Sequence, residues 1–479
     1  MTDPDRTIHF VSLGCPKNRV DSEVMLGVAE SSGFRHVPEP ETADVIVVNT
    51  CGFIDAAKQE SIQTILELGA HKQGRCQKLV VAGCLSQRYA SELESELPEV
   101  DHFLGSSDML KLERVLSGDA ERLLVGNPAD WVVRSSDPRR LSTRGASAYL
   151  KLAEGCNRNC SFCVIPQIRG KQRSRSAEDV LEEARRLAAA GVLELNLVSQ
   201  DTVAYGRDLK DGASLAKLVE RIAAVPGLRW VRLFYLYPET LDAALLELLA
   251  GHPRVVPYVD MPLQHAADAM LRRMRRGHGG ARLRQVVERL RARIPELVLR
   301  TAFIVGHPGE TDAEFEELCD FVTWAEFDRV GVFRYSDETT AHAYTLDGKV
   351  PEKTAAARAK KLMSLQRRIS RRKNRALVGR ELDVLVEGPS EESEFVMVGR
   401  HAGQAPEIDG VVYLSEGLVQ PGEMRRARIT KATDYDLLGA VQDDAATTAT
   451  STAARAEPSP SALVHRQSDG RRIALRTLT

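Results

Sequence analysis

The feature that most constrains the fold of this 479-residue chain is a repeated alternation of short apolar runs with helix-like stretches. Between residues 148 and 335 the runs are rich in β-branched residues: "AYLKLA", "LELNLVS", "WVRLFYL", "VVPYVDM", "LRTAFIV" and "RVGVFRY". This pattern predicts parallel strands joined by helices. Residues 145–377 are therefore expected to form an open or partial (β/α) TIM-like barrel, whose working face is the carboxyl end of its strands. A long basic helix, about 352–376, is expected to close it.

A shorter version of the same alternation occupies residues 6–117. The runs "IHFVSLG", "ADVIVVN" and "KLVVAG" end at Gly or Asn, and helix-like stretches at 21–31 and 55–68 lie between them. These features predict an amino-terminal open parallel α/β domain with helices on both faces. Residues 118–144 contain Pro, Asp, Arg and Gly without periodicity, so they are predicted to be a linker.

The carboxyl-terminal part changes character after residue 378. Short alternating strands, "ELDVLVEG", "EFVMVGR", "GVVYLSE" and "MRRARITK", predict a small β-barrel over 378–446. The remaining residues, 447–479, are rich in Ala, Thr and Ser and are predicted to be a disordered tail.

Composition limits the classes of protein that this chain can belong to. A net charge of -2 excludes a globally basic nucleic-acid binder. The start, "MTDPDRTIHF", has no signal-peptide core, and no apolar run approaches the roughly 18 residues of a membrane span. We expect a cytoplasmic protein with no membrane partner. In that reducing compartment, clustered cysteines indicate metal ligands rather than disulfides.

Three cysteines, Cys156, Cys160 and Cys163, lie within eight positions in "AEGCNRNCSFCVIP". Thiolates are the standard ligands of a [4Fe–4S] cube, and three of them leave one iron with an open position. S-adenosylmethionine (SAM) bound at that iron would place its sulfonium beside a reducing cluster. The alternative, a zinc knuckle, requires a fourth Cys or His nearby, and none follows within 80 residues.

Three other cysteines share a local context: Cys15 follows "VSLG", Cys51 follows "VVNT" and Cys84 follows "VVAG". Each lies just beyond the carboxyl end of a predicted strand. Because these ends gather along one edge of a parallel sheet, we expect the three to meet there and hold an auxiliary [4Fe–4S] cluster. Cys76 and Cys319 lack this context and are expected to be unligated thiols.

Over about residues 7–440 the chain resembles the radical-SAM methylthiotransferases. The resemblance depends on "GCPKNRVDSE", "NTCGFID", "EGCNRNCSFCVIPQIRGKQRSR", "YLYP", "MPLQH" and "PGET". It implies an amino-terminal methylthiotransferase domain, a central radical-SAM domain and a carboxyl-terminal TRAM barrel. It also implies that Cys15, Cys51 and Cys84 bind the auxiliary cluster and that Cys156, Cys160 and Cys163 bind the SAM cluster. Two SAM molecules are used per turnover in the family. A reductant is the implied electron donor.

The family divides by substrate. A MiaB-like branch modifies an adenosine of tRNA, and a RimO-like branch modifies the β-carbon of an aspartate in small-subunit ribosomal protein twelve. "GCPKN" and "TDYDLLG" resemble the RimO-like branch. One departure is His307, where Phe is usual. The resemblance therefore implies an alkylthio transferase that acts on a ribosomal protein, with the tRNA substrate as the alternative.

Charge provides an independent argument about the substrate. Residues 378–440 contain twelve acidic and six basic residues, a net charge of -6. Because RNA binding depends on neutralising phosphates, an acidic barrel favours a basic ribosomal protein as the partner. An acidic surface kept for solubility is the plain alternative. A third possibility for the whole chain is a non-catalytic, metal-stabilised RNA-binding module.

Other polar residues lie at predicted strand ends of the central barrel. They are Gln200 and Asp201 in "SQD", and Gln264 and His265 in "PLQH". Ligand contacts in such barrels gather at this face, so these four are candidate SAM or substrate contacts, with capping or packing as the alternative. No Ser–His–Asp or paired-carboxylate system is evident, so no catalytic residue is assigned beyond the cluster ligands.

Overall fold

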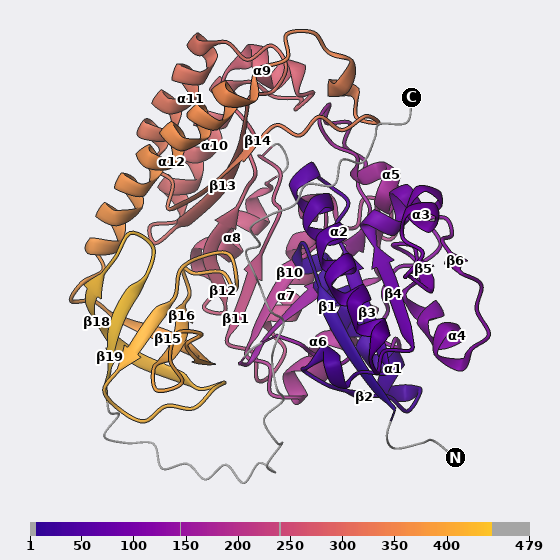
Figure 1. Cartoon of the computed structure of the whole chain (residues 1–479). Coiled ribbons are helices and arrows are strands. Elements are labelled where there is room, and N and C mark those ends of the chain that lie inside the picture. Colours follow the sequence, from indigo (N-terminus) through magenta and orange to yellow (C-terminus); the bar gives the residue numbers. More distant parts are fainter. Residues whose placement is uncertain (1–5, 144, 239–240, 443–479) are drawn as a thin grey trace.

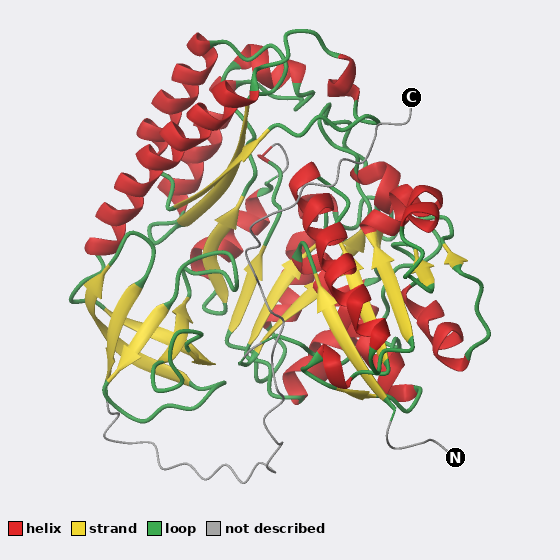
Figure 2. Ribbon diagram, viewed as in Figure 1, coloured by secondary structure: helices red, strands yellow, loops and turns green. Residues whose placement is uncertain are grey.

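The computed structural model describes residues 6–143, 145–238 and 241–442. Two parallel sheets covered by helices lie side by side, and a small β-barrel packs beside the second sheet (Figures 1 and 2). The predicted fold class is therefore confirmed. The tail predicted to be disordered, 447–479, lies outside the described residues. Among the described residues, no helix combines the length and apolar character needed to cross a lipid bilayer.

The amino-terminal sheet has the strand order β2-β1-β3-β4-β5-β6, and every neighbouring pair is parallel. Its strands are β1 (Thr7–Ser12), β2 (Arg35–His36), β3 (Val45–Thr50), β4 (Lys78–Gly83), β5 (His102–Leu104) and β6 (Leu123–Leu124). The helices are α1 (Pro16–Ser31), α2 (Asp55–Gly69), α3 (Cys84–Glu96) and α4 (Leu112–Ser117). Strands β1, β3 and β4 are the three that the sequence predicts. Strand β6 lies within the segment expected to be a linker.

Side chains along these strands point alternately to the two faces of the sheet, and both faces are apolar, which explains why helices cover each face. On β3, Val45 and Val47 are buried in the cluster that includes α1 and α4, while Ile46 and Val48 are buried in the cluster that includes α2. Successive side chains of a strand point to opposite faces, so a strand that is apolar throughout must be covered on both sides.

The central sheet has the order β14-β13-β12-β11-β10-β7 and is parallel throughout, as an open partial barrel requires. Its strands match the six predicted runs: β7 (Ser147–Lys151), β10 (Glu194–Val198), β11 (Trp230–Leu233), β12 (Val255–Asp260), β13 (Val298–Val305) and β14 (Arg329–Arg334). The helices are α5 (Ile165–Arg169), α6 (Ala177–Ala189), α7 (Leu215–Ala223), α8 (Ala243–Gly251), α9 (Asp268–Arg273), α10 (Gly280–Arg293), α11 (Asp312–Ala325) and α12 (Glu352–Arg375). A short antiparallel pair, β8 (Ala153–Glu154) and β9 (Arg173–Ser174), flanks the cysteine loop.

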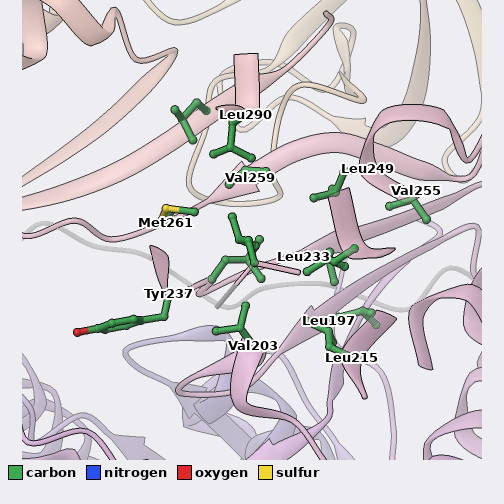
Figure 3. Packing of buried hydrophobic residues seen from close by; sticks show 14 of the residues in the cluster. Leu197, Val203, Leu215, Leu233, Tyr237, Leu249, Val255, Val259, Met261 and Leu290 are labelled. Atoms are coloured by element: carbon green, nitrogen blue, oxygen red, sulfur yellow. The ribbon is translucent and has the colours of Figure 1, made fainter. Parts of the chain in front are cut away.

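The core of this domain lies between the sheet and its outer helices. Leu197, Leu233 and Val259 from three strands pack against helix residues such as Leu215 and Leu249 (Figure 3). The basic helix α12 packs along β14 and α11, and its apolar residues Leu362 and Ile369 are buried in the same cluster. This arrangement leaves the carboxyl edge of the sheet as the place for polar residues.

The carboxyl-terminal part is a closed barrel with the strand order β15-β16-β17-β19-β18. The strands are β15 (Glu381–Pro389), β16 (Met397–His401), β17 (Val412–Ser415), β18 (Met424–Ala432) and β19 (Leu437–Val441). Strand β19 was not predicted. It pairs in parallel with β17 and antiparallel with β18, and so closes the barrel.

One apolar cluster joins the three parts of the molecule. It contains Val20 and Val24 of α1, Tyr149 of β7, Phe234 just after β11, and Leu385 of the barrel. Because these side chains come from all three parts, α1 is packed directly against the central sheet. The first turn of α1 therefore lies beside the carboxyl edge of that sheet.

Candidate active site

The first cysteine set lies at the carboxyl edge of the amino-terminal sheet. Cys15 is the residue before α1, Cys51 directly follows β3, and Cys84 is the first residue of α3. Chain connections reverse direction between β1 and β3, since β2 lies on one side and β4 on the other. In open parallel sheets this switch point is where ligands bind.

Glycines allow the three cysteines to approach one another. A side chain at Gly14, which has a φ of +93°, would place its Cβ 2.9 Å from the Cβ of Cys51. A Cβ at Gly52 would lie 2.7 Å from the carbonyl oxygen of Cys84. Both contacts are too short for any other residue, so the loops after β1, β3 and β4 are in direct contact. The sequence prediction that the three cysteines meet is consistent with this packing.

Positive charge surrounds this cysteine set. Arg169 Nη2 donates to Cys84 Sγ at 3.3 Å, and it also donates to Asn18 Oδ1 at 2.6 Å. Burial raises the pKa of Cys51 to about 12, and Cys84 and Cys15 add to the shift. Burial also acts to raise the pKa of Cys15, but the Lys17 ammonium and nearby N–H groups bring it below its ordinary value. Cations beside buried sulfurs favour the thiolate form that binds metals.

The second cysteine set lies on the loop that β8 and β9 hold in place. Cys156 N donates to Gly170 O at 3.1 Å, and Cys163 N donates to Cys160 O at 3.2 Å. Arg276 Nη1 lies 3.3 Å from Cys160 Sγ. Burial raises the pKa of Cys156 to about 11 and that of Cys163 to about 12. Metal binding must displace these protons, because a coordinating thiol is deprotonated.

A buried ionic network connects the two cysteine sets. Arg169 Nη1 pairs with Asp21 at 2.8 Å and with Glu154 at 3.4 Å, and Lys151 Nζ bridges the same two carboxylates at 2.5 and 2.7 Å. Burial raises the pKa of Glu154, but Lys151 and Arg169 outweigh it and lower the pKa to about 2. Glu154 also accepts a hydrogen bond from Gln200 Nε2 at 2.5 Å. The network thus runs from Cys84 to the carboxyl end of β10.

Gln200 and Asp201 lie beside the second cysteine loop, as the sequence suggests. Asp201 Oδ2 accepts from Arg158 Nε at 2.6 Å, and Arg158 N lies 3.4 Å from Cys156 Sγ. Their other acceptors, Gln200 Oε1 and Asp201 Oδ1, are buried and have no hydrogen-bond partner within the described part of the chain. Buried acceptors normally have a donor. The amino and hydroxyl groups of SAM are donors of the required kind.

His265 and Gln264 lie one strand further along the edge. His265 Nε2 lies 3.1 Å from Glu310 Oε1, and its Nδ1 accepts from Ala267 N at 3.1 Å. Both ring nitrogens are thus engaged within the protein, so His265 positions Glu310 and has no nitrogen left for a ligand. Gln264 has a φ of +75°, and its backbone pairs with the strand of Phe303. No contact in the described residues links the Gln264 side chain to either cysteine set.

His307, the departure from the family pattern, is fully buried. Its Nδ1 lies 3.1 Å from Pro308 O, which only accepts, so Nδ1 carries the proton. Its Nε2 therefore accepts from Ser161 Oγ at 3.2 Å, and Ser161 lies between two cysteines of the second loop. The ring also packs edge-on against Tyr335, with centroids 5.2 Å apart. The imidazole thus supports the cysteine loop.

The donor set fits iron–sulfur cubes. Six thiols from two sets have cationic neighbours, and buried acceptors lie beside the second set. No three His, Cys, Asp or Glu side chains in the described ranges converge closely enough to hold a single metal ion. In a cube each thiolate binds a different iron, so the sulfurs need not converge. Cys76 and Cys319 are buried in apolar clusters instead.

Sequence reasoning did not identify the charged partners of the cysteines. Arg169 and Arg276 reach sulfurs 85 and 116 positions away along the chain. Glu154, which precedes the cysteine loop, lacked any periodic or spacing signal. The signal for Arg169 was its place in "IPQIRG", inside the motif of the second cysteine set.

Comparisons with known proteins agree with this architecture. Residues 7–105 match the model described as "Uncharacterized protein family UPF0004", residues 150–322 match the "Radical SAM superfamily", and residues 378–441 match the "TRAM domain". The central barrel, its three-cysteine loop and this match define a radical SAM enzyme.

Two relatives identify the family to which this chain belongs within the radical SAM enzymes. A "Ribosomal protein uS12 methylthiotransferase RimO" from Sorangium cellulosum is 71% identical over 446 residues, which cover 92% of this chain and 91% of the relative. A protein of the same name from Anaeromyxobacter sp. (strain Fw109-5) is 51% identical over 91% of this chain and 93% of its own. The chain belongs to the RimO family of radical SAM methylthiotransferases, and it is a transferase.

Solved structures support the fold alone. The radical S-adenosylmethionine methyltransferase TsrM from Kitasatospora setae, solved with cobalamin and a [4Fe-4S] cluster bound, aligns with a TM-score of 0.51. The alignment covers 69% of this chain and 75% of TsrM at 16% identity. The shared feature is the arrangement of sheets and helices.

Proposed function

We propose that this chain replaces a hydrogen on the β-carbon of an aspartate in ribosomal protein uS12 with a methylthio group. The observation that carries the proposal is the pairing of two three-cysteine sets in a chain 71% identical to a uS12 methylthiotransferase. The family's cofactors are SAM and two [4Fe–4S] clusters. When bound, they supply a radical that removes a hydrogen from carbon and a sulfur that carries a methyl group.

Each cysteine set has its own part in this proposal. Cys156, Cys160 and Cys163 bind three irons of the SAM cluster, and Arg276 offsets the negative charge at Cys160. Cys15, Cys51 and Cys84 bind the auxiliary cluster, with Arg169 beside Cys84. Three ligands in each set leave one iron open, which is the site that SAM or a sulfur atom requires.

Gln200 and Asp201 are the residues of this chain proposed to contact SAM. Their unpartnered buried oxygens are acceptors beside the loop of the SAM cluster. Arg158 fixes Asp201, and the buried Glu154 fixes Gln200, so both side chains are held before SAM arrives. Preorganised acceptors bind a ligand with less loss of side-chain entropy.

The proposed partner is the basic ribosomal protein itself, and the barrel offers a surface for it. Phe395 and Leu418 are 90% and 95% exposed and lie on the loops after β15 and β17. The pairing of Met397 with Leu414 brings both loops to the same end of the barrel. Glu394 and Glu416 flank these apolar tips. Acidic residues around exposed apolar ones are complementary to a basic protein surface.

The proposed reaction also requires an electron donor and a reducing compartment. An external reductant delivers the electron that starts radical formation, because reductive cleavage of SAM consumes one electron. The reaction would take place in the cytoplasm, where uS12 is found and where reduced cysteines persist.

The test is incubation of the anaerobically reconstituted enzyme with SAM, a reductant and either uS12 or tRNA. We expect a methylthio mass gain on uS12, lost when its target aspartate is replaced by alanine. Modification of tRNA alone would overturn the protein substrate. Zinc in place of iron, without cleavage of SAM to 5′-deoxyadenosine, would overturn the enzyme itself.

A further inference from the structure

We propose that Lys17 binds the side-chain carboxylate of the substrate aspartate, an inference that rests on the proposed function. Lys17 lies two residues after Cys15, in the first turn of α1, and is only 9% exposed. Its Nζ lies 3.4 Å from the centroid of the ring of Tyr235, the second residue after β11. The ammonium group therefore lies where the carboxyl edges of the two sheets meet.

Lys17 and the nearby buried Lys151 differ in their contacts with carboxylates. Within the described ranges the Lys17 ammonium forms no salt bridge, whereas the fully buried Lys151 pairs with Asp21 at 2.5 Å and Glu154 at 2.7 Å. Buried charges are normally paired with an opposite charge. The Lys17 ammonium is held by the ring and hydroxyl of Tyr235, and Glu154 acts on it only from beyond salt-bridge distance. Beside a cluster ligand, this ammonium is ready to receive an anion from a substrate.

Tyr235 holds the ammonium in a constrained geometry. Its φ of 56° is in the left-handed region, which a residue with a bulky side chain seldom adopts. The backbone is held there because Tyr235 N donates to Asp260 Oδ2 at 3.1 Å and Tyr235 O accepts from Thr202 N at 3.2 Å. Backbone strain of this kind concentrates at binding and catalytic sites. The ring and the ammonium thus form a prepared site.

The chemistry of the substrate fits this site. In aspartate, the β-carbon that reacts is bonded directly to the carboxylate carbon. An ammonium that binds the carboxylate therefore fixes the reacting carbon one bond away, beside Cys15 of the auxiliary set. An adenosine has no carboxylate, so the same contact discriminates against RNA. If Lys17 served only to balance charge at Cys15, its replacement would instead reduce the amount of bound iron.

The experiment compares the natural enzyme with Lys17→Gln and Lys17→Arg, and uses Lys111→Gln as a control on a partly exposed lysine of the same domain. Each protein receives uS12 with its natural aspartate or with asparagine at that position. We expect Lys17→Gln to keep its iron content and to lose roughly 30-fold or more in kcat/KM for the aspartate substrate, as expected for a lost buried charge pair. Its preference for aspartate over asparagine should largely disappear.

Lys17→Arg, which retains the charge, should regain part of that preference, and Lys111→Gln should match the natural enzyme. The inference is overturned if Lys17→Gln still prefers aspartate as strongly as the natural enzyme does. It is also overturned if the substitution reduces bound iron, since Lys17 would then support the cluster. Failure of the natural enzyme to modify uS12 at all would instead identify the proposed function as the error.

Discussion

Arg169 Nη2 lies 3.3 Å from the sulfur of Cys84, a residue 85 positions earlier in the chain. Arg169 ends α5, immediately after the loop of the second cysteine set, so it connects the surroundings of both sets. The same guanidinium pairs with Asp21 and Glu154, all buried. A cation in this position lowers the cost of assembling anionic thiolates in a dry environment.

Replacing Arg169 is expected to damage both stability and activity. Arg169→Met leaves two buried carboxylates with Lys151 as their only cation, which should lower the free energy of unfolding by about 3 kcal/mol or more. Methylthio transfer should fall at least tenfold. Urea unfolding and a uS12 modification assay measure the two effects. Arg185→Met, on the exposed face of α6, is the matched control, and equal behaviour of the two variants would contradict the role of Arg169.

Gln200 provides a test of the proposed SAM contact. Gln200→Leu removes the unpartnered buried oxygen while keeping the bulk of the side chain. Loss of one hydrogen bond should raise the KM for SAM by about tenfold, with a smaller change in kcat. The measurement is 5′-deoxyadenosine formation against SAM concentration. An unchanged KM would remove Gln200 from the SAM site.

The contact between barrel and central sheet depends on Glu194. Its carboxylate accepts from Arg232 of β11 at 2.9 Å and from Arg400 of β16 at 2.6 Å, and all three are buried. Glu194→Ala leaves the buried Arg232 guanidinium without its carboxylate and Arg400 with Glu387 alone, and should cost about 3–5 kcal/mol of unfolding free energy. Urea unfolding monitors this cost. Glu183→Ala removes one of two carboxylate partners from both Arg139 and Arg175, and is a comparison within the same domain that does not involve the barrel.

His307 is expected to contribute to a loss of stability in acid, together with His36 and His401, whose pKa values burial also lowers. Burial lowers the pKa of His307 from 6.5 to about 4. Below about pH 6.5 the unfolded chain binds a proton that the folded chain excludes, so the free energy of unfolding decreases as the pH falls toward 4. The contribution is about 3 kcal/mol over that window. His307→Phe should make the dependence between about pH 7 and about pH 5 less steep in urea unfolding, while His36 and His401 keep their share of it. An equally steep loss in the variant would show that other groups cause it.

Much of this fold could be predicted from sequence because strongly apolar strands carry a local signal. The runs that became β1, β3 and β4, and the six of the central sheet, are each long enough to show it. Strands β2 and β6 have only two residues each, so pairing with neighbours defines them rather than their own composition. Strand β19 is defined by closure of the barrel, which depends on partners far away in sequence.

The same difference between local and long-range signals separates the site residues that could be predicted from those that could not. The cysteines were predictable because spacing and strand-end position are local features. The pairing of Lys17 with Tyr235, and of Arg276 with Cys160, depends on how separate parts of the chain pack together. His265 is a case in which a local signal suggested too much. Its position at a strand end predicted a ligand contact, but Glu310 and Ala267 occupy both ring nitrogens.

The most direct test of the account is the iron content of the natural chain and of the variant with Cys15, Cys51 and Cys84 all replaced by alanine. After anaerobic reconstitution the natural chain should hold about eight irons and the variant about four, the content of one cube. The variant should still cleave SAM and should no longer insert sulfur into uS12. A variant that keeps the full iron content, or that still produces methylthiolated uS12, would contradict the assignment of these three cysteines to a second cluster.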